Sequence, residues 1–414
     1  MRSVKKERIA VVGQGYVGLP LAIEAARNFE AVYGVDIDSA RIQMLCQGIS
    51  PIEDVSDSEI KELLVSHRYQ PTTDFSSLSE VNIVVICVPT PLGDNQRPDL
   101  SALGHAVDSI KKFISPNALI ISESTSFPGT LRWIVEKFSD LQQFQTLLFA
   151  VAPERINPSD STWRMTNTPR IIGGINASSL EQAMNFYSSF CKSVFAVETP
   201  EIAEFAKLFE NTFRFVNIGL VNEMLHLSNS LGIDFRKVLD AAATKPYGFM
   251  RFEPGAGVGG HCIPVDPMYL QFAFENSGVK SSYIETSRGQ NEKSKRYVCD
   301  RVSEIDQSGS VLLIGVAYKA NVADTRESPA QFIATELTRR GYRVLWTDSL
   351  VETWSSAEKW DGIERCDIAV NLVTHINAEY ENVLDCSKIL LDTTGSLKRI
   401  NLSSKAQIKK IRSL

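Results

Sequence analysis

The chain has 414 residues, which is too long for one hydrophobic core, so two or three domains are expected. A hydrophobic fraction of 43%, a charged fraction of 22% and a net charge of −6 are typical of a soluble globular protein and argue against nucleic acid or a membrane surface as a partner. Seven cysteines without a CxxC pair argue against a disulfide framework or a bound metal. With a charged start and no apolar run long enough for a membrane span, these features predict a cytoplasmic protein.

A glycine-rich turn follows the first predicted strand. Residues 8–12 are predicted as a buried strand, the turn has the pattern G-x-G-x-x-G, and a helix and a second strand (31–35) lead to Asp36. Such glycines permit a tight turn, the approach of a pyrophosphate and close helix packing, while Asp36 would bind a ribose diol and favour NAD over NADP. Arg41 is near enough in sequence to weaken that preference. The expected cofactor contacts are Gly13, Gly15, Tyr16, Val17, Gly18, Asp36 and Arg41.

Polar residues follow the next three predicted strands, which span 81–88, 118–122 and 147–152. In a parallel sheet, ligands bind outside the carboxyl ends of the strands. Ordinary turn chemistry is the alternative explanation for these clusters. Glu154, an acid between a buried strand and an arginine, favours a functional site. The candidate residues are Pro89, Thr90, Thr125, Glu154, Arg155 and Ile156.

A long helix is predicted over residues 200–231, and it is apolar on more than one face. Such a helix is buried between domains or against a second subunit. Lys207, Asn211 and Arg214 follow one another at i, i+4 and i+7 and therefore form one polar stripe. The alternative is a solvated face, but an asparagine and two cations in an aromatic helix favour a ligand site.

The loop 254–267 carries four glycines within six positions, then Cys262, and then Asp266 between two prolines. Glycines such as Gly257 and Gly259 let a backbone fold tightly and approach a ligand closely. The alternative is a surface loop with an incidental cysteine. We expect the neighbouring His261 to be a loop-packing residue, because adjacent residues in a loop generally point apart.

Helices are then predicted over 235–243 and 269–301, and a second α/β part follows. It has strands at 310–316, 342–347, 367–373 and 389–393 and a helix at 331–340. This part lacks the glycine motif, but Lys319 and Arg326 could hold a phosphorylated ligand unless Arg326 pairs with Asp324 or Glu327. The fold class is therefore α/β, with two Rossmann-like doubly wound parallel sheets joined by a central long-helix segment. The predicted domains are 1–198, 199–303 and 304–414.

The ordered set of motifs resembles the UDP-glucose/GDP-mannose dehydrogenase family over nearly the whole chain. The motifs are GQGYVGLP (13–20), CVPTP (87–91), the Glu-Ser-Thr and Pro-Gly-Thr segments (123–130), APER (152–155), Lys207 with Asn211, GVGGHCIPVDP (257–267), GVAYK (315–319) and DTRESPA (324–330). The resemblance implies an NAD-binding domain, a central dimerisation segment that makes a homodimer, and a nucleotide-sugar domain. It also implies oxidation of the C6 alcohol of a nucleotide sugar to a carboxylate with two NAD+.

The loop sequence and KPYGF (245–249) are most similar to the UDP-N-acetylhexosamine branch, which makes uronates for surface polysaccharides. UDP-N-acetylmannosamine enzymes tend to carry His-Pro-Arg where this chain has Lys245-Pro246-Tyr247, so Arg251 is the candidate substitute cation. UDP-GlcNAc and UDP-ManNAc both stay open as substrates. A UDP-glucose 6-dehydrogenase is the alternative.

The resemblance also implies covalent chemistry, in which Cys262 traps the aldehyde as a thiohemiacetal and then carries a thioester. Lys207 and Asn211 would stabilise the oxyanions, and Asp266 or Glu154 would activate water that Thr125 orients. Arg326 joins the expected cofactor contacts. The expected substrate contacts are Glu154, Arg155, Ile156, Lys207, Asn211, Arg214, Arg251, Gly257, Gly259 and Lys319.

Overall fold

The computed structural model describes residues 5–52, 54–156, 162–376, 380–397 and 411–414. The charged start at residues 1–4, which entered the prediction of location, lies outside the described residues. The chain forms two compact units. The first unit is Met1–Glu210 with Met268–Val279, and the second unit is Asn211–Pro267 with Lys280–Leu414.

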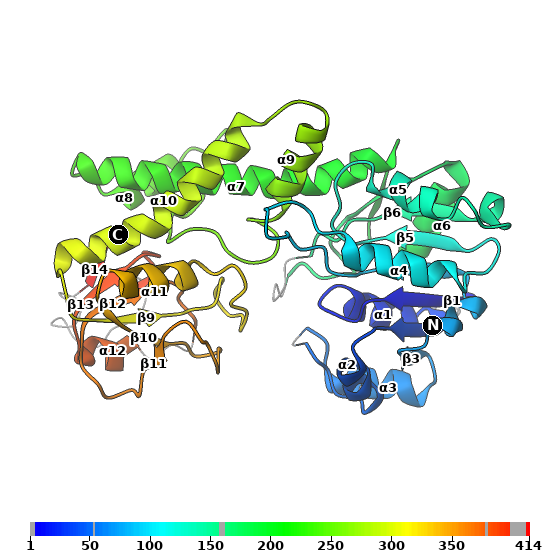
Figure 1. Cartoon of the computed structure of the whole chain (residues 1–414), viewed down its shortest axis with the longest axis horizontal. Helices are drawn as coiled ribbons and strands as arrows, with labels where there is room; N and C mark the ends of the chain where they lie inside the picture. Colours follow the sequence, from blue (N-terminus) through cyan, green and yellow to red (C-terminus); the bar gives the residue numbers. More distant parts are fainter. Residues whose placement is uncertain (1–4, 53, 157–161, 377–379, 398–410) are drawn as a thin grey trace. The chain divides into compact units, whose positions relative to one another are not determined.

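The first unit contains an eight-stranded sheet in the order β3-β2-β1-β4-β5-β6-β7-β8 (Figure 1). Every neighbouring pair is parallel except β6 and β7. The strands are β1 (Lys5–Val12), β2 (Phe29–Val35), β3 (Tyr69–Thr72), β4 (Ile83–Ile86), β5 (Leu119–Ser122), β6 (Leu148–Val151), β7 (Arg170–Gly174) and β8 (Val194–Val197). The α-helices between them are α1 (Gly18–Ala26), α2 (Ser39–Cys46), α3 (Asp57–Val65), α4 (Ser101–Lys111), α5 (Thr130–Lys137) and α6 (Ala177–Tyr187).

This sheet is covered on both faces, because successive side chains of a strand point to opposite sides. Ile9 and Val11 of β1 lie in one core cluster with residues of α1, α3 and α6. Ala10 and Val12 lie in another cluster with residues of α4 and α5. The short central strands are therefore apolar at every position, as β4 with its four buried residues shows.

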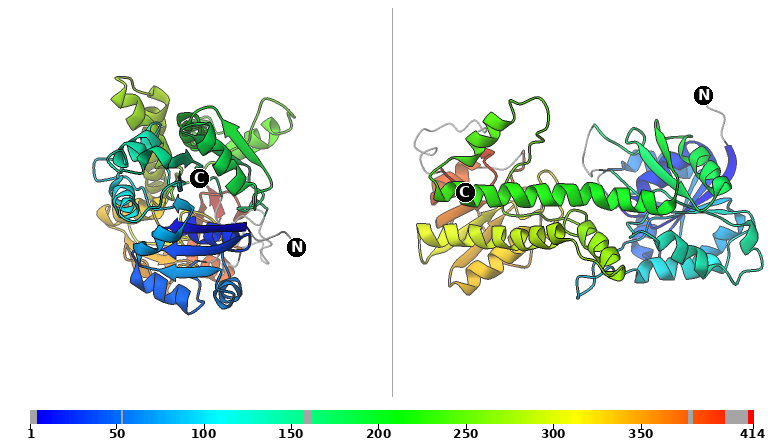
Figure 2. Two further views of the ribbon diagram at one scale, coloured as in Figure 1. Left: turned by 90° about the vertical axis from the view of Figure 1, so that its right-hand side faces the viewer. Right: turned by 90° about the horizontal axis from the view of Figure 1, so that it is seen from above.

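Helix α7 (Pro200–Ser230) confirms the predicted long helix and runs from the first unit into the second. Figure 2 shows it as one uninterrupted ribbon. The predicted helix over 269–301 is wrong, because two helices stand there, α9 (Asp266–Asn276) and α10 (Ser282–Ile305). Gly278 adopts a φ of +79°, and the Val279 amide donates to the Phe274 carbonyl at 3.0 Å, which ends α9.

The second unit contains a six-stranded parallel sheet in the order β11-β10-β9-β12-β13-β14 (Figure 1). The strands are β9 (Ser310–Ile314), β10 (Arg343–Thr347), β11 (Glu358–Lys359), β12 (Cys366–Asn371), β13 (Ser387–Asp392) and β14 (Ile411–Ser413). Its further helices are α8 (Phe235–Ala242), α11 (Pro329–Arg339) and α12 (Tyr380–Cys386). In chain order, this arrangement repeats that of β1 to β6, so the predicted pair of doubly wound sheets with a long helix between them is confirmed.

Three further observations bear on the composition of the chain. All seven cysteines are free. Among the described residues, no cluster of three or more His, Cys, Asp or Glu side chains could hold a metal ion. No helix in the described ranges combines the length and the apolar character that a bilayer crossing requires.

Candidate active site

The glycines of the turn after β1 differ in how closely other atoms approach them. A Cβ atom on Gly13, whose φ is +95°, would lie 2.2 Å from the Cys87 carbonyl oxygen. A Cβ atom on Gly18 would lie 1.9 Å from the Gly13 carbonyl oxygen. A Cβ atom on Gly15 would meet no atom within 4 Å. Helix α1 starts here without a side-chain cap, so its amino end suits a phosphate group beside Gly15.

Asp36 follows β2 and is tied to the same turn. Its carboxylate accepts hydrogen bonds from the Gln14 amide at 2.7 Å and from the Asp38 amide at 2.9 Å. Arg41 forms an ion pair with it, with 3.0 Å between Nη1 and Oδ2. The expected proximity of Arg41 to Asp36 is therefore confirmed. Tyr16 is exposed and Val17 is half-buried in this turn.

The ends of β4 and β5 are joined by one serine. The Ser124 hydroxyl accepts from the Val88 amide at 2.9 Å and donates to the Val88 carbonyl at 2.9 Å. The Tyr269 hydroxyl donates to the Thr90 carbonyl at 2.8 Å. Thr90 and Thr125, both half-buried, therefore lie on loops that are fastened to each other, and Pro89 is exposed beside them.

Glu154 and Lys207 form a buried pair after β6. Lys207 Nζ lies 3.9 Å from Glu154 Oε2, and the two side chains are 7% and 12% exposed. The Ile156 amide donates to the Glu154 carboxylate. Arg155, by contrast, is engaged by protein groups, because its Nε donates to Glu210 at 3.0 Å and its Nη1 to the Pro169 carbonyl at 2.8 Å.

Sequence reasoning missed a buried charge cluster behind these strand ends. The Glu123 carboxylate accepts from Arg170 at 3.0 Å and from the Tyr187 hydroxyl at 2.5 Å. Burial raises the pKa of Glu123, although Arg170 and Tyr187 act in the opposite direction. Arg170 lies on β7, which the sequence did not reveal as a strand, so only the acid after β5 could have given a signal.

Sequence reasoning also missed Glu204 on α7. Its carboxylate is 1% exposed and accepts from the backbone amides of Gly129 at 2.7 Å and Leu131 at 2.9 Å. The Ser126 hydroxyl donates to it at 3.4 Å. The signal in the sequence is an acid three positions before Lys207, which places both side chains on one face of the helix.

In the second unit, the thiol loop is bonded to α7 through one carboxylate. The Asn211 amide group donates to Asp266 Oδ2 at 2.6 Å, and the two residues are 7% and 1% exposed. The Asp266 amide in turn donates to the Cys262 carbonyl at 2.8 Å. Cys262, which is half-buried, therefore lies one helical turn before a carboxylate that Asn211 holds.

Close packing explains why this loop contains several glycines, and the composition alone did not reveal it. A Cβ atom on Gly257 would lie 2.8 Å from Asn291 Oδ1 of α10. A Cβ atom on Gly259 would lie 2.7 Å from the Glu327 carbonyl oxygen. Gly260, at a φ of +84°, would meet the Tyr318 ring at 2.7 Å. The loop therefore needs glycine because other parts of the protein approach it closely.

His261, predicted as a loop-packing residue, contacts Tyr318 and Arg326, and its role stays a prediction. Its ring makes an edge contact with the Tyr318 ring at 6.4 Å between centroids, and its Nδ1 lies 3.4 Å from Arg326 Nη2. Arg326 itself adopts the alternative pairing, with 2.6 Å between its Nη2 and Asp324 Oδ2. It is 54% exposed, whereas Lys319 is half-buried.

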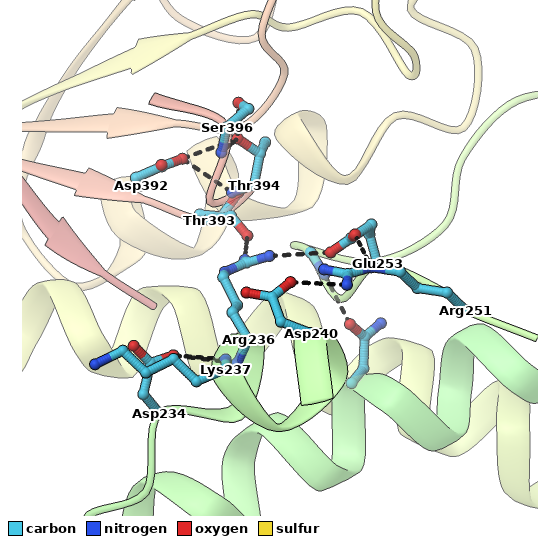
Figure 3. Close-up of polar contacts among 12 residues, drawn as sticks. Asp234, Arg236, Lys237, Asp240, Arg251, Glu253, Asp392, Thr393, Thr394 and Ser396 are labelled. Carbon is cyan, nitrogen blue, oxygen red and sulfur yellow. Dashed lines mark hydrogen bonds and ion pairs between the residues drawn. The ribbon is translucent and has the colours of Figure 1, made fainter. Parts of the chain in front are cut away.

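Arg251 belongs to a charge network at the stem of the thiol loop (Figure 3). It donates to Glu253 at 2.6 Å and to Asp240 of α8 at 2.8 Å. Arg236 of α8 lies between Glu253 and the end of β13, where it donates to the Thr393 carbonyl at 2.8 Å (Figure 3). Arg214, in contrast with the buried Lys207 and Asn211, is exposed.

Comparison with known proteins agrees with the fold and the candidate site described above. Three models of the UDP-glucose/GDP-mannose dehydrogenase family match the chain, the NAD binding domain at residues 7–191, the central domain at 201–293 and the UDP binding domain at 312–399. A UDP-N-acetyl-D-glucosamine 6-dehydrogenase of Pseudomonas aeruginosa is 35% identical over 86% of this chain and 85% of its own length. A UDP-N-acetyl-D-mannosamine dehydrogenase of Methanocaldococcus jannaschii is 32% identical over 95% and 93%.

A solved structure extends the likeness to three dimensions. The UDP-D-ManNAc dehydrogenase of Pyrococcus horikoshii superposes with a TM-score of 0.86 at 30% identity, over 98% of both chains. The chain therefore belongs to the UDP-glucose/GDP-mannose dehydrogenase family and is an NAD-dependent nucleotide-sugar dehydrogenase.

Proposed function

We propose that the chain oxidises the C6 hydroxymethyl group of a UDP-N-acetylhexosamine, UDP-GlcNAc or UDP-ManNAc, to a carboxylate for a surface-polysaccharide precursor. The names of the relatives given above support this choice over UDP-glucose. The main observation in favour of this reaction type is the thiol of Cys262. It lies on a loop whose Asp266 carboxylate accepts a hydrogen bond from Asn211. A simple alcohol dehydrogenation needs no thiol, whereas a double oxidation at one carbon needs a group that retains the aldehyde.

The residues after β1 fit the cofactor. Gly15 has free space where a side chain would stand, α1 begins without a side-chain cap, and Asp36 is held at the end of β2. When bound there, NAD+ accepts one hydride in each oxidation, so two are consumed per sugar. Pro89, Thr90 and Thr125 after β4 and β5 are the further proposed cofactor contacts. The resemblance adds Arg326, whose guanidinium a cofactor would have to share with Asp324.

The proposed covalent step begins with attack of the thiol on the aldehyde. The Cys262 thiolate forms an S–C bond to the aldehyde carbon, and the carbonyl electron pair moves to the oxygen, which takes a proton. This thiohemiacetal then loses its hydroxyl proton and a hydride, which the second equivalent of NAD+ would accept, and becomes a thioester. Water then attacks the carbonyl carbon, the C–S bond breaks, and the thiolate and the carboxylate product are released.

The resemblance assigns separate roles in this scheme to the other candidate side chains. Lys207 stabilises the thiolate and the oxyanions as a buried cation, and Asn211, one helical turn further along α7, holds Asp266. Asp266 accepts the proton of the attacking water, and Glu154, beside Lys207, is the second candidate for this role. Thr125 orients the same water.

The remaining substrate contacts are proposed from the resemblance. They are Ile156, Arg214, Gly257, Gly259 and Lys319. Arg155 and Arg251 already bind carboxylates of the protein, so a substrate would have to share them.

We also propose a homodimer through α7. Phe213, Leu220 and Leu227 are spaced by seven residues and are 40%, 51% and 54% exposed, so they form an apolar stripe on one face of the helix. A second copy of the same stripe is the proposed occupant. Light scattering of Leu220→Asp with Leu227→Asp should give a monomer, and an unchanged mass would refute this interface.

The predicted domains 1–198, 199–303 and 304–414 contain the three family matches one by one, which supports this division. The seven free thiols support a reducing compartment, so we propose a cytoplasmic location.

NADH production from UDP-GlcNAc, UDP-ManNAc, UDP-GalNAc and UDP-glucose tests the substrate. We expect one of the first two to give the highest kcat/KM and two NADH per sugar. UDP-glucose as the best substrate would refute the proposal, and one NADH per sugar would refute the double oxidation.

A further inference from the structure

Glu204 is a buried carboxyl group whose described hydrogen-bond donors include no cation. Its three donors are the Gly129 amide, the Leu131 amide and the Ser126 hydroxyl. All three belong to the loop after β5 and to the first turn of α5. The carboxylate of one helix therefore caps the amino end of another, where unpaired amides and the helix dipole favour a negative charge.

Helix α5 has no other side-chain cap. Its N-cap residue is Gly129, in the left-handed conformation at a φ of +100°, and a glycine has no side chain with which to cap the helix. Glu204, 75 residues further along the chain from Gly129, supplies the missing acceptor. An acceptor from a distant element fixes the position of the loop in a way that a local cap could not.

The capped loop is the one that carries Thr125. Ser124, its neighbour, is fastened to Val88 at the end of β4. Glu204 itself lies on α7, three residues before Lys207, so the two side chains leave the same face of the helix. Lys207 in turn reaches Glu154 after β6. Glu204 therefore connects the end of β5 to the helix turn that presents the cation.

We propose that Glu204 is a positioning residue that sets the distance between Lys207 and Thr125. The inference rests on the proposed function, because both partners are assigned to the reacting centre there. Glu204 itself touches neither substrate nor cofactor in this scheme. It acts by accepting from two amides at once, which only an ionised carboxylate with two free oxygens does well.

The charge environment supports a role that varies with pH. Burial raises the pKa of Glu204 to about 7, against the hydrogen bonds from Leu131, Gly129 and Ser126. The other charged groups that act on it are Glu201 on α7 and Arg132 on α5. Because the folded pKa lies above the usual range, lowering the pH through about 7 protonates the carboxyl group and weakens the cap.

The test is Glu204→Gln, which keeps the shape of the side chain but replaces one acceptor oxygen by an NH2 group. This donor would then face a backbone N–H group, which is also a donor. The matched control is Glu201→Gln, which removes a surface acid one turn earlier that is 30% exposed and paired with Arg132. We expect kcat to fall by about 10- to 100-fold in Glu204→Gln, with KM for NAD within about twofold of the unmodified chain. Amide exchange at Gly129 and Leu131 should quicken in this variant alone.

The pH profile separates positioning from a structural effect. The ratio of unmodified to Glu204→Gln activity should rise as the pH passes upward through about 7, because only the unmodified chain gains its carboxylate there. A folded Glu204→Gln protein with unchanged kcat, or with a ratio that does not vary with pH, would overturn the inference. Lowered thermal stability at unchanged kcat would overturn it too.

A second variant covers the case in which Glu204→Gln does not fold. Ser126→Ala deletes one donor and leaves the carboxylate in place, and it should lower kcat by a few-fold with faster exchange at Gly129. Unchanged kcat in that variant would equally count against positioning. If the unmodified chain oxidises none of the four UDP-sugars, the proposed function fails, while the exchange result still reports whether Glu204 holds the loop.

Discussion

Replacing Cys262 by alanine separates the side chain of this residue from its backbone role. The Cys262 carbonyl accepts from the amides of Val265 at 3.1 Å and Asp266 at 2.8 Å, and both bonds survive the change. The side chain is half-buried and loses one sulfur atom, so the cost in the free energy of unfolding is expected to be about 1 kcal/mol. The melting temperature should therefore fall by only about 2–4 °C.

The catalytic loss should be far larger. Without a thiolate the aldehyde has no covalent anchor, so uronate formation should fall by on the order of 10³-fold or more. The assay follows NADH per sugar together with a carbonyl-trapping reagent, and we expect at most one NADH and a trapped aldehyde. NAD binding should keep its Kd within about twofold, because Cys262 is not among the proposed cofactor contacts. Uronate formed by Cys262→Ala at the unmodified rate would refute the covalent route.

Three further variants test other parts of the structure. Lys207→Ala should lower kcat by about 10²- to 10³-fold, because one oxyanion donor is lost; steady-state rates that show only a higher KM would assign Lys207 to binding alone. Asp36→Ser should raise the ratio of NADP to NAD in kcat/KM by about tenfold or more, since a 2′-phosphate is no longer repelled, and an unchanged ratio would contradict the ribose role. Burial raises the pKa of Asp348, but hydrogen bonds led by that of His375 outweigh it and lower the pKa to about 2. Asp348 therefore stabilises the fold above its unfolded pKa and loses this contribution as the pH falls toward 2, so Asp348→Asn should cost about 2 kcal/mol in urea unfolding at neutral pH. An unchanged urea midpoint would contradict this.

The interior strands could be predicted because their burial leaves a direct trace in the sequence. β4 and β5 are four-residue runs that are buried at every position and are followed by polar turns. The edge strands left no such trace. In β8, Phe195 is 65% exposed, and β11 has only two residues, so neither differs from loop sequence. Their pairing is fixed by the neighbouring strand rather than by their own composition.

The candidate site likewise contains residues that the sequence could predict and contacts that it could not. Most candidate residues could be named because they lie at a strand end, in the glycine turn or in the thiol loop, and Lys207, Asn211 and Arg214 because they form one polar stripe on α7. Their partners could not be named, since Asn211 meets Asp266 across 55 positions and Glu204 meets Gly129 across 75. Hydrogen bonds of this kind depend on how helices and loops are packed, which periodicity does not encode.

The two units place an aspartate at the same point of the same strand order, and its neighbours decide what it can do. Asp36 accepts from the Gln14 and Asp38 amides and pairs with Arg41, a half-buried cation. Asp348 accepts from the amides of Val316, Ala317, Leu350 and Val351 and from His375. Five donors already occupy the second carboxylate, and its side chain is 0% exposed. We therefore propose that this position recognises the ribose in the first unit, whereas in the second unit it holds the loops after β9 and β10 together.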